Sequence, residues 1–274
     1  GYFMWELEAV PKGFHRALDV VDEIWTATEL VANEFRNVTE TPVHVTGHAV
    51  DVSAAEEVTR AELGISDDAF VVHFAFDANS TVARKDPNAA LDAFRLAFGD
   101  DPNVLFLLKI RNFQQVESLS RQGDPHARRL ISRLQNTSNV VLVAGEWSYG
   151  RSIGLIDLAD CYLSLHRCEG YGYGIAEAKG VGTPVIATGY SGNVTSAQHQ
   201  WDWHSGFNMV RVLPGEYFYW QPDMQWAEPD VEHAAELLRL LRRERSQARD
   251  TEGFSAPFGP GTLSDRLEVL LRSH

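Results

Sequence analysis

Apolar, strand-like runs alternate with amphipathic helical segments along most of this chain. The runs are AFVVHFAF (69–76), NVLFLLKI (103–110), NVVLVAG (139–145), CYLSLH (161–166) and TPVIATG (183–189). Helical patterns follow the first four runs, at 87–98, 118–135 (with an interruption near Gly123 and Pro125), 152–160 and 174–182. Apolar strands separated by helices predict a parallel sheet that is covered on both faces. We therefore expect a doubly wound α/β domain over about 60–220, with FNMVRVL (207–213) as its sixth strand.

A polar stretch, HAVDVSAAEE (48–57), separates this domain from a shorter α/β pattern at the amino end. That pattern consists of a helix at 14–23, a strand at 23–28, a second helix at 29–37 and a strand at 42–47. Two more amphipathic helices are expected at 230–244 and 262–272. The predicted division is therefore 1–50, 51–250 and 251–274.

The charge and the cysteine content exclude several classes of protein. A net charge of −14 repels a polyanion, so nucleic acid is not an expected partner, and an anionic ligand needs a local cluster of cations. Two cysteines, Cys161 and Cys168, do not make a disulfide framework, and they are read as reduced thiols of a cytoplasmic protein. No apolar run approaches the roughly 18 residues of a membrane span. The first residues, GYFMWELEAVP, do not have the pattern of a signal peptide.

The stretch 166–193, HRCEGYGYGIAEAKGVGTPVIATGYSGN, carries two glutamates that have seven residues between them. Glu169 lies in the loop after a predicted strand, and Glu177 lies one turn into the next helix. Ligands of doubly wound folds bind beyond the carboxyl ends of the strands, so both acids are expected to overhang one cleft. The second small-residue loop, GYSGN (189–193), also follows a strand and is expected beside the same cleft.

The residues of this loop suit a ligand that has a phosphate between two groups of hydroxyls. Gly170 and Gly172 let the backbone approach a ligand closely, and the N–H groups of a helix that begins near Tyr173 favour a phosphate. A carboxylate accepts hydrogen bonds from vicinal hydroxyls. A nucleotide sugar has this layout. The plainer interpretation is a turn with solvated acids near a helix start. Each glutamate taken alone fits this interpretation better than it fits a nucleotide-sugar site.

The whole stretch resembles the signature of the family 4 glycosyltransferases, which are retaining nucleotide-sugar enzymes of GT-B fold. The form EGFG…EAM…G-PVI becomes EGYG…EAK…GTPVI here. The resemblance continues in LIDLADCYLSLHR (155–167), WAEPDVEHAAELLR (226–239), DEIWTATELVANEF (22–35), PVHVTGHAVD (42–51) and ARKDPNAALDAF (83–94). It implies a Rossmann-like donor-binding domain, to which residues 1–50 add the tail of a second, acceptor-side domain.

The resemblance also implies roles for particular residues. Glu169 would contact the donor sugar and Glu177 would hold the ribose hydroxyls. The backbone of Gly170, Tyr171 and Gly172 would lie beside the sugar and diphosphate. Lys85 would neutralise the diphosphate with the help of Arg84, although a solvated pair of loop residues is the plainer interpretation of these two cations.

The sequence departs from the family pattern at two places. Many members have a Gly-Arg pair at the end of the first strand of this domain, where this chain has Phe76 and Asp77. A cation is missing there, and Lys109, at the end of another strand, is the candidate to compensate. Most of the acceptor-side domain is also absent from the sequence, so this chain alone is expected to be inactive if it is only the donor-binding half.

The expected activity is hexosyl transfer from a nucleotide diphosphate sugar to a glycan, lipid-linked or protein acceptor, with retention of configuration. The resemblance implies no metal and no cofactor. The protein is expected in the cytoplasm, and the resemblance also allows peripheral contact with the inner face of a membrane. The main alternative is a non-catalytic nucleotide-sugar binding module. A nicotinamide-dependent oxidoreductase shares the fold class, but FAFDANS (74–80) stands where G-x-G-x-x-G would follow the first strand.

An aromatic cluster, EYFYW (216–220), lies near Trp201, Trp203 and Trp226 in the sequence. Aromatic faces can stack on sugars, so one hypothesis places this cluster along an acceptor path. The other hypothesis is an apolar patch that packs against the missing part of the acceptor-side domain.

Overall fold

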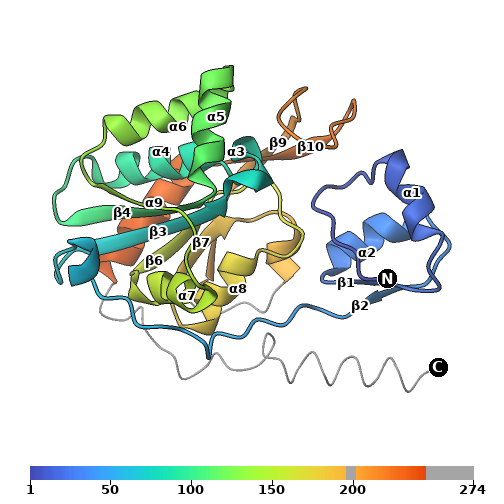
Figure 1. Ribbon diagram of the computed structural model, residues 1–274, viewed down its shortest axis with the longest axis horizontal. Coiled ribbons are helices and arrows are strands. Elements are labelled where there is room, and N and C mark those ends of the chain that lie inside the picture. The colour runs from blue at the N-terminus through green and yellow to red at the C-terminus, as the bar shows by residue number, and fades with distance from the viewer. Residues whose placement is uncertain (196–201, 245–274) are drawn as a thin grey trace.

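The computed structural model describes residues 1–195 and 202–244, and Figure 1 shows them as a layered α/β structure. A six-stranded parallel sheet forms its centre, with the strand order β5-β4-β3-β6-β7-β8. The strands are β3 (Phe70–Asp77), β4 (Val104–Arg111), β5 (Val140–Ala144), β6 (Cys161–Ser164), β7 (Val185–Thr188) and β8 (Asp202–Ser205). Counted along the chain this is the order 3-2-1-4-5-6 of Rossmann-like folds. The predicted fold class is confirmed.

Side chains of β3 alternate between two apolar layers, as a doubly covered strand requires. Phe70, Val72 and Phe74 pack with α4 (Pro87–Phe98), α6 (Pro125–Gln135) and α9 (Val231–Arg243). On the opposite face, Val71 packs with α7 (Tyr149–Leu158). There α7 in turn packs against α8 (Tyr173–Gly180). In Figure 1, α4 lies above the sheet, and α7 and α8 lie below it.

The chain order reverses between β3 and β6, which are neighbours in the sheet although they are first and fourth in sequence. Their helices therefore leave toward opposite faces, and a crevice opens beyond their carboxyl ends. The loop after β3 leads into α3 (Val82–Lys85) and then α4. The loop after β6 contains Glu169 and leads into α8. The sheet topology thus brings the two sequence motifs to one crevice.

The amino-terminal residues form a small unit beside this crevice. It contains α1 (Lys12–Leu18), β1 (Ile24–Thr26), α2 (Glu29–Arg36) and β2 (Val43–Val45), and β1 pairs with β2 in parallel. An extended segment with one short helical turn, η1 (Ala61–Leu63), leads from it to the main sheet. The Thr28 hydroxyl donates to the carbonyl of Gly170 at 3.1 Å, which joins the unit to the glycine loop. The predicted division at residues 50 and 250 stays a prediction.

The predicted sixth strand is wrong. Residues 207–211 form β9 (Phe207–Arg211), which pairs antiparallel with β10 (Gln225–Pro229) outside the main sheet. The sixth strand of the sheet is β8, whose residues Asp202–Ser205 pair in parallel with Val185–Thr188. The more apolar run FNMVRVL attracted the prediction, whereas DWHS has a weak pattern and gains its place from pairing with β7.

The interruption predicted near Gly123 and Pro125 is confirmed, and it divides the segment 118–135 between two helices. The first, α5 (Phe113–Gln122), starts earlier than predicted and ends at Gly123, which has a φ of 103°. The second, α6, begins at Pro125 and is capped by the Asp124 carboxylate, which accepts from the N–H of Ala127. A residue in the left-handed region ends a helix, and proline suits the first turn of the next. The predicted helix at 262–272 lies outside the described residues.

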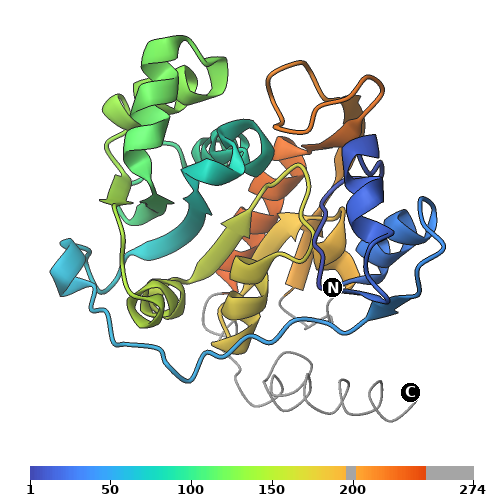
Figure 2. The ribbon, with the colours of Figure 1, turned by 45° about the vertical axis from the view of Figure 1, so that its right-hand side comes forward.

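The aromatic cluster packs against the amino-terminal unit. Tyr217 and Tyr219 contact the ring of Trp5, with ring centroids 6.0 and 5.9 Å away, and the Tyr217 hydroxyl donates to Glu6 at 2.5 Å. Figures 1 and 2 show the β9–β10 hairpin next to α1. The hypothesis of a packing patch concerned a part of the acceptor-side domain outside residues 1–50, so this contact does not test it. Trp226 is buried in the same core, and Trp201 lies outside the described residues.

Candidate functional site

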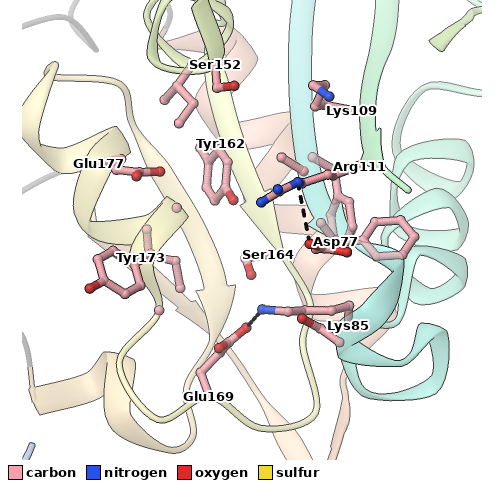
Figure 3. A pocket seen from close by; sticks show the side chains of 18 of the residues that line it. Asp77, Lys85, Lys109, Arg111, Ser152, Tyr162, Ser164, Glu169, Tyr173 and Glu177 are labelled. Atoms are coloured by element: carbon pink, nitrogen blue, oxygen red, sulfur yellow. Dashed lines mark hydrogen bonds and ion pairs between the residues drawn. The ribbon is translucent and has the colours of Figure 1, made fainter. Parts of the chain in front are cut away.

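A cleft of about 680 Å³ opens where the strand order reverses. Its walls come from the ends of β3, β4 and β6, from α3, α7 and α8, and from residues 4 and 6 of the amino-terminal unit. Figure 3 shows Glu169 and Lys85 at one end of this cleft and Glu177 farther along it. All seven residues singled out in the sequence line it: Arg84, Lys85, Glu169, Gly170, Tyr171, Gly172 and Glu177. Their roles stay predictions.

Glu169 forms ion pairs with both cations of α3. One carboxylate oxygen accepts from Lys85 Nζ, and the other lies 3.3 Å from Nη1 of Arg84. Glu169 is 8% exposed and Arg84 is 6% exposed. Arg84 also donates to the carbonyls of Ser80 and Cys168. The plainer interpretation of Arg84 and Lys85, a solvated loop pair, is therefore wrong.

The two cations shift the ionisation of Glu169. Burial by itself raises the pKa of a carboxyl, but the charges of Lys85 and Arg84 outweigh it and lower the pKa of Glu169 to about 2. The same contact with Glu169 raises the pKa of Arg84 above its ordinary value despite burial. Glu169 is therefore an anion at neutral pH.

A second ion pair, just behind the first, fixes the distance between the two motifs. Asp86 follows Lys85 and caps α4 by accepting from the N–H of Ala89. Its other oxygen lies 3.0 Å from Nε of Arg167, two residues before Glu169. The backbone N–H of Arg167 also donates to the carbonyl of Arg84 at 2.8 Å. These contacts hold the cationic turn and the glutamate loop in one register.

The glycine loop is shaped by close packing of backbone against backbone. Gly172 has a φ of 84° and precedes the first turn of α8, which suits a residue without a side chain. A Cβ on Gly170 would lie 2.4 Å from the carbonyl oxygen of Trp5, so this loop leaves no room for a side chain there. The first residues of α8, Tyr173 and Gly174, line the cleft, and the first N–H groups of a helix have no partner within the helix.

Glu177 occupies a different environment from Glu169. Burial raises its pKa, and a hydrogen bond from the Tyr149 hydroxyl only partly offsets this. Burial, together with the contact with Glu177, raises the pKa of Tyr149 to about 12. Glu177 is therefore an acceptor that faces the cleft without a cationic partner among the contacts described for it.

Two cations at the end of β4 also line the cleft. Lys109 was proposed from the sequence as a compensating cation. Its ammonium group donates a hydrogen bond to the carbonyl of Gly145, and the residue is 6% exposed. Arg111 was missed by the sequence reasoning, and it lies 3.8 Å from Asp77 and 3.4 Å from Glu146. Its position directly after the predicted strand 103–110 was the signal that could have identified it.

Within residues 1–195 and 202–244, no group of three His, Cys, Asp or Glu side chains is arranged to hold a metal ion. Across the same residues, no helix has the length and apolar character of a membrane span. Cys161 and Cys168 are buried free thiols, as predicted.

The fold matches solved glycosyltransferases of the GT-B fold, although no protein-family model and no curated protein matches the sequence. Sucrose-phosphate synthase from Thermosynechococcus elongatus aligns with a TM-score of 0.64 and 18% identity, over 94% of this chain and 60% of that one. HepE from Anabaena, solved with UDP-glucose, aligns with a TM-score of 0.57 and 16% identity, over 93% and 65%. The pneumococcal O-GlcNAc transferase GtfA, solved with UDP and GlcNAc, gives 0.57 and 16%, over 95% and 47%.

This chain thus spans about half to two thirds of the length of those structures. At such identities the likeness shows the fold alone. The likeness defines the fold class of this chain, which is a Rossmann-like α/β protein whose architecture matches part of a GT-B glycosyltransferase.

Proposed function

We propose that this chain is the donor-binding half of a retaining glycosyltransferase similar to family 4. It would move a hexose from a nucleotide diphosphate sugar to an acceptor hydroxyl. The observation that carries this proposal is the meeting of Glu169, Glu177 and Lys85 in one cleft at the reversal of the strand order. The solved neighbours that contain UDP or UDP-glucose add support.

Each group in the cleft has a role in this proposal. Glu177 accepts from the ribose hydroxyls, and Glu169 accepts from the hydroxyls of the donor sugar. Lys85 and the first N–H groups of α8 neutralise the diphosphate, whose charge grows as the sugar leaves. Because Lys85 pairs with Glu169, donor binding has to share the ammonium between a carboxylate and a phosphate.

In this reaction the main demands are positioning and stabilisation of the leaving diphosphate, and an oxygen of that diphosphate takes the proton of the acceptor hydroxyl as the new glycosidic bond forms. We propose that it proceeds without a metal or cofactor, in the cytoplasm or at the inner face of a membrane. The acceptor would be a glycan, a lipid-linked glycan or a protein, and it would approach from the side of residues 1–50.

Calorimetric titration with nucleoside diphosphates and their sugar conjugates tests the site. Glu177→Gln is expected to weaken every ligand about tenfold, which is the loss of one hydrogen bond to a charged group. Glu169→Gln is expected to weaken the sugar conjugates by a similar factor. It should leave the bare diphosphates as tight as before or tighter, because it frees Lys85. Glu29→Gln, at an exposed surface ion pair with Arg36, is the matched control.

The proposal fails if the parent binds none of these ligands, or if both cleft variants bind all of them as the parent does. A radiolabelled-donor assay with acceptor mixtures then separates an enzyme from a non-catalytic binding module. An enzyme transfers or slowly hydrolyses the donor, whereas a binding module retains affinity and leaves the donor intact.

A further inference from the structure

Three of the four described cations that line the cleft are mostly buried in contacts with the protein itself. Arg84 is almost fully buried among carbonyls and Glu169. Lys85 pairs with Glu169, and its side chain is 20% exposed. Lys109 is buried and donates to the carbonyl of Gly145. These contacts limit how far each of them can turn toward a ligand.

Arg111 differs from the other three in exposure. Its side chain is 60% exposed, and its guanidinium approaches Asp77 and Glu146 at 3.8 and 3.4 Å. Both distances exceed the roughly 2.7–2.9 Å of a strong charge-assisted hydrogen bond. Figure 3 shows Arg111 at the end of its strand, with its side chain directed into the cleft and a contact to Asp77. Most of its five N–H donors therefore remain available.

Asp77 is fixed in place and so can orient Arg111. One of its oxygens accepts from the backbone N–H of Asn79 at 2.9 Å and from Nδ2 of Asn112 at 2.8 Å. Its other oxygen faces Arg111. Two neutral donors thus hold the Asp77 carboxylate in place, and its remaining oxygen lies 3.8 Å from Arg111 at the lining of the cleft.

We propose that Arg111 is a phosphate-binding residue of this cleft and that Asp77 is its positioning residue. A planar guanidinium binds two phosphate oxygens at once, and the local cation offsets the repulsion from a chain of net charge −14. This places a cation beside the strand end where the family pattern has one and this sequence has Asp77. That the phosphate belongs to a sugar donor rests on the proposed function, but the anion site itself does not.

Inorganic pyrophosphate is the probe, titrated into the full chain by calorimetry at two salt concentrations. Arg111→Gln is expected to weaken pyrophosphate about tenfold or more, the loss of a hydrogen-bonded charge, and to reduce the dependence of affinity on salt. Arg111→Lys should recover part of the affinity but not the bidentate component. Arg129→Gln is the matched control, because Arg129 is 57% exposed and pairs with Asp92 away from the cleft.

Four outcomes decide the inference. An Arg111-dependent pyrophosphate site in a protein that binds no nucleotide sugar would support the anion site and contradict the proposed function. A protein that binds nucleotide sugars through Glu177 but pyrophosphate equally with and without Arg111 would overturn the inference and retain the function. Equal weakening by Arg111→Gln and Arg129→Gln would reduce the effect to net charge and overturn it. Parent protein that binds neither ligand would overturn both.

Discussion

The two ends of the cleft hold the same kind of side chain in opposite electrostatic states. At one end, Glu169 is buried between two cations, and its pKa is lowered to about 2. At the other end, Glu177 is partly buried beside the Tyr149 hydroxyl, and its pKa is raised. The motif places both acids in one signature, yet their neighbours come from different elements.

Because of this difference, removal of either acid should have a different effect on the stability of the fold. Removing one partner of a buried ion pair leaves an uncompensated charge, which is costly. Removing an acid whose ionised form is already disfavoured by burial costs little. We therefore expect Glu169 to be a structural residue as well as a binding residue, and Glu177 to serve binding at some expense of stability.

The largest expected effect is that of Glu169→Ala on folding. It would remove the carboxylate of Lys85 and leave Arg84 with only the more distant Glu6, 3.9 Å away, so the free energy of unfolding should fall by about 3–5 kcal/mol. Urea unfolding followed by circular dichroism measures this. A loss below about 1 kcal/mol would show that solvent, rather than Glu169, neutralises these cations.

Acid unfolding should reveal the same ion pair. A carboxyl whose pKa is lowered on folding contributes stability that is complete above its unfolded pKa and is lost as the pH falls through its folded pKa. For Glu169 that window runs from about 4.5 down to about 2. Its contribution is on the order of 3 kcal/mol. The parent should lose more stability than Glu169→Gln across this window, and parallel curves would contradict the assignment.

Glu177 should respond to pH with the opposite sign. Its pKa is raised on folding, so its ionisation opposes folding at neutral pH, and protonation as the pH falls relieves that cost. Glu177→Gln should therefore change the free energy of unfolding at pH 7 by no more than about 1 kcal/mol, in the stabilising direction. A strong destabilisation would mean that the carboxylate has a partner in the fold that outweighs burial.

The smallest expected effect is at the exposed contacts of Arg111. Asp77→Ala should lower the free energy of unfolding by less than about 1 kcal/mol apart from its loop hydrogen bonds, and added salt should erase the ion-pair part. A double-mutant cycle of Asp77→Ala and Arg111→Gln isolates that part. A coupling energy as large as that of the Glu169 pair would remove the contrast between buried and exposed pairs.

The sequence predicted the parallel sheet well because its evidence is local. Five apolar runs fall within a residue or two of β3, β4, β5, β6 and β7, since buried strands are apolar throughout. The sixth strand escaped because β8 is short and polar and is specified by pairing with β7. The hairpin strand β9 attracted the prediction because an apolar run does not show which sheet it joins.

The candidate site divides in the same way. The acids and the glycines were found from the sequence, because strand ends and motif spacing indicate which edge of the sheet they reach, whereas the Arg84–Lys85 pair was identified only through the family resemblance. Arg111 was not found, because its proposed role in phosphate binding depends on the exposure of its side chain and on its contact with Asp77. Asp77 lies 34 positions earlier in the chain. The burial of Arg84 was not found either, because three of its partners come from other segments.

The sequence by itself determined the alternation of strands and helices and placed the two acids and the glycines at the cleft, because hydrophobic periodicity and glycine placement act over a few neighbouring positions. Only the tertiary structure decided which cations are engaged and which acid is held ionised. Those properties depend on burial and on charges brought together from distant parts of the chain, and an ion pair changes its strength with its distance from water.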